Sequence, residues 1–141
     1  MIIDKALELA DKQVLTGAAV STNVIDFGVD DPNPNVDFGN GRLTCVFTVN
    51  ADVTGDIMFK LQDSADGTTF ADIASSPEAS FKSPVAGTKC AIPLPGHIRR
   101  YLRANFVKDT ATSATALTKG TVSAHIVWGF DDNVAPKGAA L

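Results

Sequence analysis

The sequence predicts an all-β protein, a single jelly-roll β-sandwich that spans residues 1–141. Three observations favour this fold class. Thirteen Val, thirteen Thr and eight Ile make the chain rich in β-branched residues, which suit the half-buried surface of a sheet. Eleven Gly and seven Pro supply frequent turns. Apolar and polar residues alternate along several short segments, as they do in strands with one buried face.

The clearest alternation lies in residues 43–50, 57–61, 98–106 and 122–128. Successive side chains of a strand point to opposite faces, so the apolar set of each segment shares one face. We expect these side chains to form the core of the single domain. They are Leu43, Cys45, Phe47 and Val49, then Ile57, Phe59 and Leu61, then Ile98, Leu102, Ala104 and Phe106, and finally Val122, Ala124, Ile126 and Trp128.

Weaker strand patterns cover residues 23–28, 68–73 and 89–94. Asp66-Gly67 supplies residues that tolerate positive φ in a tight hairpin, so residues 56–73 are predicted to form two paired strands. The neighbouring Asp63 is assigned to the same turn. Seven or eight short strands at this spacing favour a jelly roll.

The two ends of the chain do not fit this pattern. In residues 1–15, Ile3, Leu7 and Val14 lie at helical spacing, but Leu7 and Leu9 also alternate as in a strand. Both a helix and an extended N-terminal arm remain open, and the β context favours the arm. Residues 131–141 contain few large apolar side chains, so we expect a flexible C-terminal tail.

Charge excludes several classes of partner. Twelve basic against sixteen acidic residues give a formal net charge of −4, which disfavours nucleic acid and anionic membranes. No apolar run approaches the roughly 20 residues of a membrane-spanning helix. Asp4, Lys5 and Glu8 interrupt the first nine residues, unlike a secretion signal. We therefore expect a soluble protein that is not exported.

One segment has the rhythm of a calcium loop. Residues 31–37 place oxygen-bearing side chains at alternate positions. Val36 stands where such a loop needs Gly, and Arg42 stands where it needs a bidentate carboxylate. We interpret the segment as a solvated Pro/Asn loop and expect no metal.

The remaining candidates for chemistry are two histidines and two cysteines. His97 and His125 are isolated, so we expect surface or hydrogen-bonded roles for them and no metal site. Cys45 and Cys90 fall on predicted inward faces, where burial raises the pKa of a thiol and makes it inert. The sequence thus predicts no catalytic residue and no cofactor, and the protein is not expected to be an enzyme.

The strongest candidate for binding is an outward row formed by Arg99, Tyr101 and Arg103. Arginine and tyrosine dominate the energetic hot spots of protein interfaces. The alternative is an ordinary solvated face. Arg100 breaks the inward row and is expected at the rim of the sheet, where its stem covers apolar surface.

The chain resembles the capsid cement, or decoration, proteins of short-tailed double-stranded DNA phages, of the type carried by a Bordetella phage. Four stretches carry the resemblance across nearly the whole chain. They are Met1-Ile2-Ile3-Asp4 with Leu7-Glu8-Leu9, Ser21-Thr22-Asn23-Val24-Ile25-Asp26, Arg100-Tyr101-Leu102-Arg103 and Gly120-Thr121-Val122-Ser123-Ala124. Residues 31–37 and the tail after Phe130 depart from the family pattern.

The resemblance implies a jelly-roll homodimer on the outer surface of the phage head, made in the host cytoplasm, that bridges neighbouring major capsid proteins. We expect the contacts to involve the outward row, the arm and the tail. The candidate interface residues are Ile2, Ile3, Arg99, Tyr101, Arg103, Val134 and Leu141.

Two other functions compete with this interpretation. A carbohydrate- or receptor-binding module of a phage fibre needs exposed aromatic rings in a groove, yet Trp128 is predicted to face inward and Tyr101 is the only tyrosine. A small β-fold enzyme needs a nucleophile, a base or a metal constellation, and the sequence presents none.

Overall fold

The structure, a computed structural model, describes residues 7–30, 43–73, 76, 78–95, 97–110 and 113–128. It confirms the all-β prediction, because the regular elements of these residues are ten strands. No helix in these ranges is long and apolar enough to cross a membrane. The strands are β1 (Glu8–Leu15), β2 (Ala19–Val20), β3 (Ile25–Asp26), β4 (Leu43–Thr54), β5 (Asp56–Ser64), β6 (Ala71–Asp72), β7 (Ala79–Lys82), β8 (Lys89–Pro93), β9 (Tyr101–Lys108) and β10 (Lys119–Trp128).

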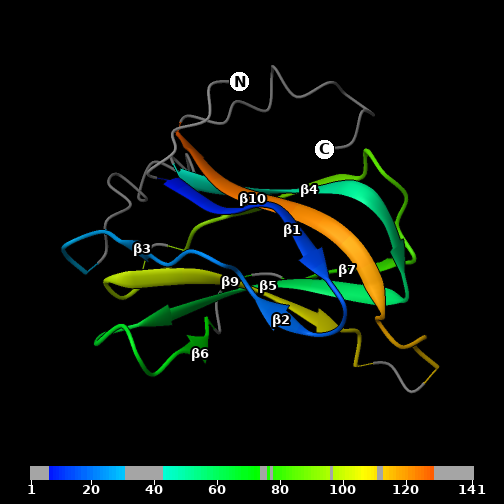
Figure 1. Cartoon of the computed structure of the whole chain (residues 1–141). Helices are drawn as coiled ribbons and strands as arrows, with labels where there is room; N and C mark the ends of the chain where they lie inside the picture. Colours follow the sequence, from blue (N-terminus) through cyan, green and yellow to red (C-terminus); the bar gives the residue numbers. More distant parts are fainter. Residues whose placement is uncertain are drawn as a thin grey trace.

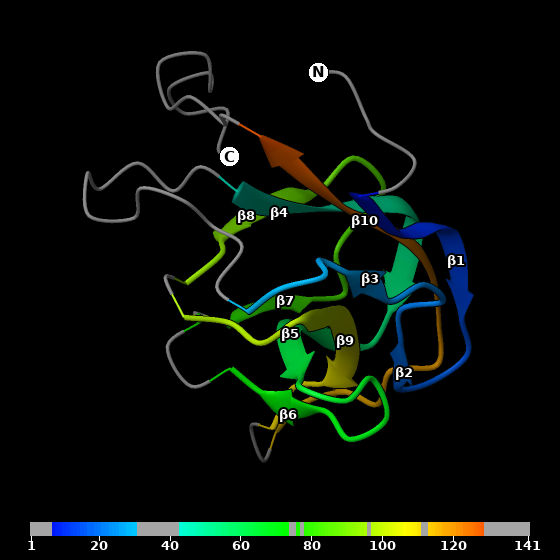
Figure 2. The same ribbon diagram turned by 90° about the vertical axis from the view of Figure 1, so that its left-hand side faces the viewer.

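Two antiparallel sheets form the two layers seen in Figures 1 and 2. Sheet A has the order β1-β10-β4-β8, and sheet B has the order β2-β9-β5-β6. In sheet B, β3 also pairs with β9 and β7 also pairs with β5, so β2 with β3, and β6 with β7, each occupy the position of one edge strand. Counted that way, the first, eighth, third and sixth strands form sheet A, and the second, seventh, fourth and fifth form sheet B. This is the strand order of a jelly roll.

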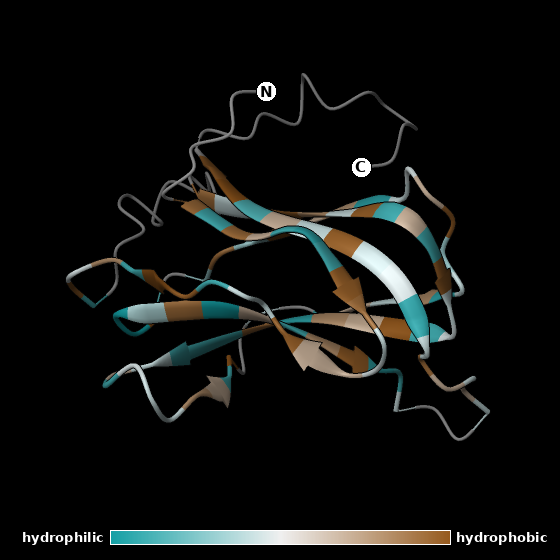
Figure 3. Ribbon diagram, in the orientation of Figure 1, coloured by the Kyte–Doolittle hydropathy of each residue, from teal (hydrophilic) through white to brown (hydrophobic). Residues whose placement is uncertain are grey.

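The core lies between the sheets and is organised around three phenylalanines. Phe47 of β4 stacks on Phe59 of β5 with ring centroids 4.8 Å apart, and Phe106 of β9 meets both rings edge-on at 6.2 and 5.9 Å. Such pairs add to the free energy of burial. Every inward side chain predicted in the four clearest segments is at most 6% exposed, except Trp128, whose side chain is outside the described part of the chain. Figure 3 shows the alternation of hydrophobic and hydrophilic residues along the strands.

The N-terminal prediction needs correction. Residues 8–15 form β1 and pair with β10, so the helical alternative is wrong for them, and the extended segment is part of sheet A rather than a separate arm. Leu9 and Leu15 are buried. The pairing shifts register twice and Lys12 has a φ of 48°, which disrupts simple alternation. Residues 1–6 and the predicted tail, residues 131–141, lie outside the described residues, as does the loop of residues 31–37.

Other strand boundaries differ from the predictions. Of residues 23–28, only β3 pairs, and of residues 68–73, only β6 does. The predicted hairpin is present because β5 pairs with β6, but a loop of six residues replaces the tight two-residue turn. The strand predicted at residues 98–106 begins at Tyr101 rather than Ile98. The strand predicted at residues 89–94 is confirmed by β8.

His125 differs most from its prediction. It lies on the face of β10 that points away from sheet B, as predicted, but only 5% of it is exposed. Val46, its partner in β4, is also buried, so this part of sheet A is covered on both faces. Within the described part of the chain the His125 Nε2 atom has no hydrogen-bond partner, and burial lowers the pKa of the imidazole below its ordinary value of 6.5.

The buried imidazole predicts an acid-sensitive stability. Because the folded state disfavours the charged form of His125, its contribution is fully present above a pH of about 6.5 and is lost as the pH falls below that value. His125→Gln should therefore show a smaller loss of melting temperature between pH 7 and 5 than the unmodified protein. Melting curves of the two proteins that stay parallel across this range would contradict the prediction.

A single residue, Gly55, joins β4 to β5 and so connects the two sheets. Its φ is +110°, and a Cβ atom there would lie 2.2 Å from the carbonyl oxygen of Ala116 and 2.5 Å from the Cα atom of Leu117. The connection needs glycine for its backbone angle and for the space beside it.

Gly55→Ala is predicted to lower the free energy of unfolding by at least about 2 kcal/mol, because backbone strain and a backbone clash add. Gly28→Ala is the matched control. Gly28 also has a positive φ, 81°, but has nothing within 4 Å of a built Cβ, so it should cost about 1 kcal/mol. Urea unfolding of both variants checks this, and equal losses would refute the role of the Ala116 contact.

Candidate functional site

The predicted outward row lies on sheet B. Tyr101 and Arg103 are on β9, a strand flanked by β5 on one side and by β2 and β3 on the other. Leu102, Ala104 and Phe106 of this strand are buried, so Tyr101 and Arg103 point away from the core together with Asn105. We call Tyr101, Arg103 and Asn105 the β9 row. Arg99 precedes the strand and is not part of that row.

Arg99 is bound to the chain itself. Its Nε and Nη2 atoms donate to Oδ1 of Asp63 at 3.0 and 2.7 Å, and Nη2 also donates to the Asp63 carbonyl oxygen at 2.9 Å. The backbone N–H of Arg99 donates to Oδ2 of the same residue at 3.0 Å. Asp63 is only 7% exposed and belongs to β5 rather than to a turn, which corrects the prediction. These hydrogen bonds raise the pKa of Arg99 and anchor the approach to β9 on β5.

Arg100 forms a second bidentate pair. Its Nε and Nη2 atoms donate to Oδ1 and Oδ2 of Asp26 at 2.6 and 2.8 Å. Hydrogen bonds from Arg100 and from the backbone N–H of Gly28 lower the pKa of the Asp26 carboxyl to about 2. The Arg100 guanidinium also lies 5.1 Å from the centroid of the Tyr101 ring. Arg100 thus ties β3 to the start of β9 and covers a ring, as expected of a rim residue.

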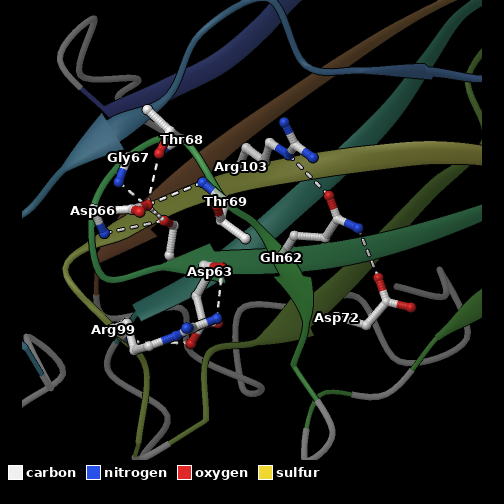
Figure 4. Close-up of polar contacts among 10 residues, drawn as sticks. Gln62, Asp63, Asp66, Gly67, Thr68, Thr69, Asp72, Arg99 and Arg103 are labelled. Carbon is white, nitrogen blue, oxygen red and sulfur yellow. Dashed lines mark hydrogen bonds and ion pairs between the residues drawn. The ribbon is translucent and has the colours of Figure 1, made fainter.

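Arg103 begins a chain of polar contacts that crosses three strands, shown in Figure 4. Its Nε donates to Oε1 of Gln62 on β5 at 2.8 Å, and Nε2 of Gln62 donates to Oδ1 of Asp72 on β6 at 2.8 Å. Lys60 Nζ lies 3.3 Å from both Asp72 Oδ2 and Glu78 Oε1. The hydrogen bond from Gln62 lowers the pKa of Asp72, although burial opposes it. These linked polar contacts hold the side chains on the outer surface of sheet B in one arrangement.

A rigid loop supports Tyr101 at the end of this face. Oδ1 of Asp66 accepts from the backbone N–H groups of Thr68 and Thr69 at 2.9 Å and from the Ser64 hydroxyl at 2.8 Å. These bonds lower the pKa of Asp66. A Cβ atom at Gly67 would lie 3.3 Å from the Tyr101 ring, so this loop packs closely against the ring.

The residues considered for chemistry are placed as follows. Cys45 is buried and Cys90 is half-buried on the inner face of sheet A. Burial raises the pKa of both thiols, that of Cys90 to about 12. His97 is exposed, far from His125 in sequence. No group of three or more His, Cys, Asp or Glu side chains in the described ranges is placed to hold a metal ion.

Several residues of this face were not predicted from the sequence. Gln62 faced outward in the predicted strand, but only the pairing of β5 with β9 places it opposite Arg103. The position of Phe70 beneath the Arg103 guanidinium, 4.1 Å from its ring centroid, depends on the loop before β6. The other predicted interface residues, Ile2, Ile3, Val134 and Leu141, lie outside the described residues.

The fold and the site together define a small, acidic jelly-roll protein with a cross-linked polar face on its second sheet. The chain matches the Bbp16 family over residues 9–126, most of its length, and it belongs to that family. The family name indicates a protein of a Bordetella phage, in agreement with the phage association that the sequence resemblance implied. No curated protein matches the chain.

The Arg99 contacts predict a stability effect at this site. Arg99→Ala leaves the nearly buried Asp63 carboxylate without its charged partner, so the free energy of unfolding should fall by about 1–3 kcal/mol. Arg100→Ala is the control. It breaks a pair whose two side chains are each 43% exposed, so its effect should be clearly smaller. Chemical denaturation of both variants measures the difference, and an equal or larger loss for Arg100→Ala would contradict this account.

Proposed function

We propose that this protein is a capsid cement protein. It binds the outer surface of the phage head as a homodimer, bridges neighbouring major capsid proteins and stabilises the expanded shell without catalysing a reaction. Membership of a phage protein family supports this proposal. The observation that carries it is the polar face of sheet B, where the side chains around β9 are held in place by ion pairs and hydrogen bonds.

A held polar face suits adhesion for an energetic reason. Long side chains lose conformational freedom when a partner immobilises them, which costs about 0.5–1.5 kcal/mol for each one. On this face, Arg99, Arg100 and Arg103 are already restrained by Asp63, Asp26 and Gln62 respectively. These side chains therefore lose much of their conformational freedom already during folding. Less side-chain entropy is then lost when a partner binds.

The stabilisation of the shell follows from mass action. A protein that binds only the expanded shell lowers the free energy of that state relative to the unexpanded one. A dimer that touches two capsid subunits makes its second contact an intramolecular event, so modest individual contacts give firm attachment. A two-fold dimer requires one self-complementary patch.

The contacts of the aromatic residues favour adhesion over sugar binding. A carbohydrate site stacks sugar rings on open aromatic rings. On the outer surface of sheet B, guanidinium groups already lie over two half-buried aromatic rings. Arg100 lies over Tyr101, and Arg103 lies over Phe70. Phe47, Phe59 and Phe106 are buried in the core. These contacts leave the outer face of sheet B suited to a polar protein partner.

Co-sedimentation with cognate phage heads tests the proposal. The purified protein is mixed with expanded and with unexpanded shells, and protein without shells controls for self-association. We expect saturable pelleting with expanded shells, little with unexpanded shells, and a higher disruption temperature for the decorated shells. Failure to bind either form, or binding without any gain in shell stability, would contradict the cement function.

A further inference from the structure

The three arginines near the start of β9 differ in how many of their guanidinium nitrogens donate hydrogen bonds. Arg99 and Arg100 each direct two guanidinium nitrogens to a carboxylate of the chain. Arg103 donates only through Nε, to Gln62. Its two terminal nitrogens, Nη1 and Nη2, have no hydrogen-bond partner among the residues that the structure describes. These two nitrogens can therefore still donate hydrogen bonds to a partner.

The position of the Arg103 guanidinium is set from two directions. The Phe70 ring lies 4.1 Å below it, and the Gln62 amide fixes its Nε. Gln62 cannot turn over without losing its second hydrogen bond, to Asp72, and Asp72 is in turn paired with Lys60. Figure 4 shows Gln62 bonded to both Arg103 and Asp72. The plane and direction of the guanidinium are therefore defined before any partner arrives.

The neighbours of Arg103 in the β9 row extend the same surface. Tyr101 and Asn105 flank it at distances of about 7 Å along the strand, and all three side chains are half-buried. The Tyr101 hydroxyl and the Asn105 amide also have no hydrogen-bond partner within the described ranges. The row presents one fixed cation between two neutral polar groups.

We propose that Arg103 is a preformed receptor for one carboxylate, an Asp or Glu side chain on the surface of the major capsid protein. The identity of this partner rests on the proposed cement function. Nη1 and Nη2 form an end-on planar fork that matches the two oxygens of a carboxylate. Lys60, Arg99 and Arg100 each have a carboxylate partner within the chain, whereas the Arg103 guanidinium has none among the described residues. Because Asp72 and Glu78 outnumber Lys60 nearby, the face suits one carboxylate at Arg103 rather than a polyanion. Tyr101 and Asn105 contact polar groups on either side.

Substitution of Arg103 tests the proposal on shells. Arg103→Lys keeps the charge but removes the planar fork, and we expect it to weaken binding to expanded cognate shells about tenfold or more. Lys89→Arg is the control, because it keeps the charge at an exposed position on β8, the edge strand of the other sheet, and its affinity should stay within about twofold of the unmodified protein. Equal affinity of Arg103→Lys and the unmodified protein would overturn the proposal.

Two further measurements separate this inference from the cement function. In side-chain NMR spectra of the free protein, sodium acetate should shift the Arg103 guanidinium signals more than those of Arg100, at constant ionic strength. Unchanged Arg103 signals would overturn the receptor even if shells are bound, whereas a shift without shell binding would refute the cement function alone. Light scattering should give the same mass for Arg103→Lys and the unmodified protein. A change in mass would assign Arg103 to contact between copies and overturn the proposal.

Discussion

The packing of three phenylalanine rings between the two sheets is the constraint on which the other features depend. Phe47 belongs to sheet A, and Phe59 and Phe106 belong to sheet B. Because side chains alternate along a strand, burial of Phe106 fixes the outward direction of Arg103 and Asn105. A slip of one residue in β9 would move the arginine into the core. The core thus determines which chemistry the outer face presents.

The outer face of sheet B is in turn organised by register. The antiparallel pairing sets Gln62 opposite Arg103 and opposite Asp72, so one amide joins groups from three strands. Cross-strand pairs of this kind contribute modestly to stability. Their larger effect is to hold long polar side chains in one geometry, which is the property that the proposed adhesion uses. The carboxylates of Asp26, Asp63 and Asp72 therefore accept hydrogen bonds from side chains of the same polypeptide.

The sequence predicted the buried strands well and the polar contacts poorly, for physical reasons. Inward positions such as Phe47 and Leu102 follow from period-two alternation, a local property. The Arg99–Asp63 pair joins residues far apart in sequence, so it depends on the register of β5 with β9. His125 was expected to have a surface or hydrogen-bonded role, but it is buried, as is Val46 opposite it. In β1, the shifts in register removed the alternation that would have identified a strand.

A cryo-EM structure of the cognate expanded shell with this protein bound tests the central claim most directly. The account predicts that the outer face of sheet B lies against the major capsid protein, with a carboxylate oxygen within hydrogen-bond distance of Nη1 or Nη2 of Arg103. A decorated shell in which this face points to solvent, while other surfaces of the protein make the contacts, would contradict the account.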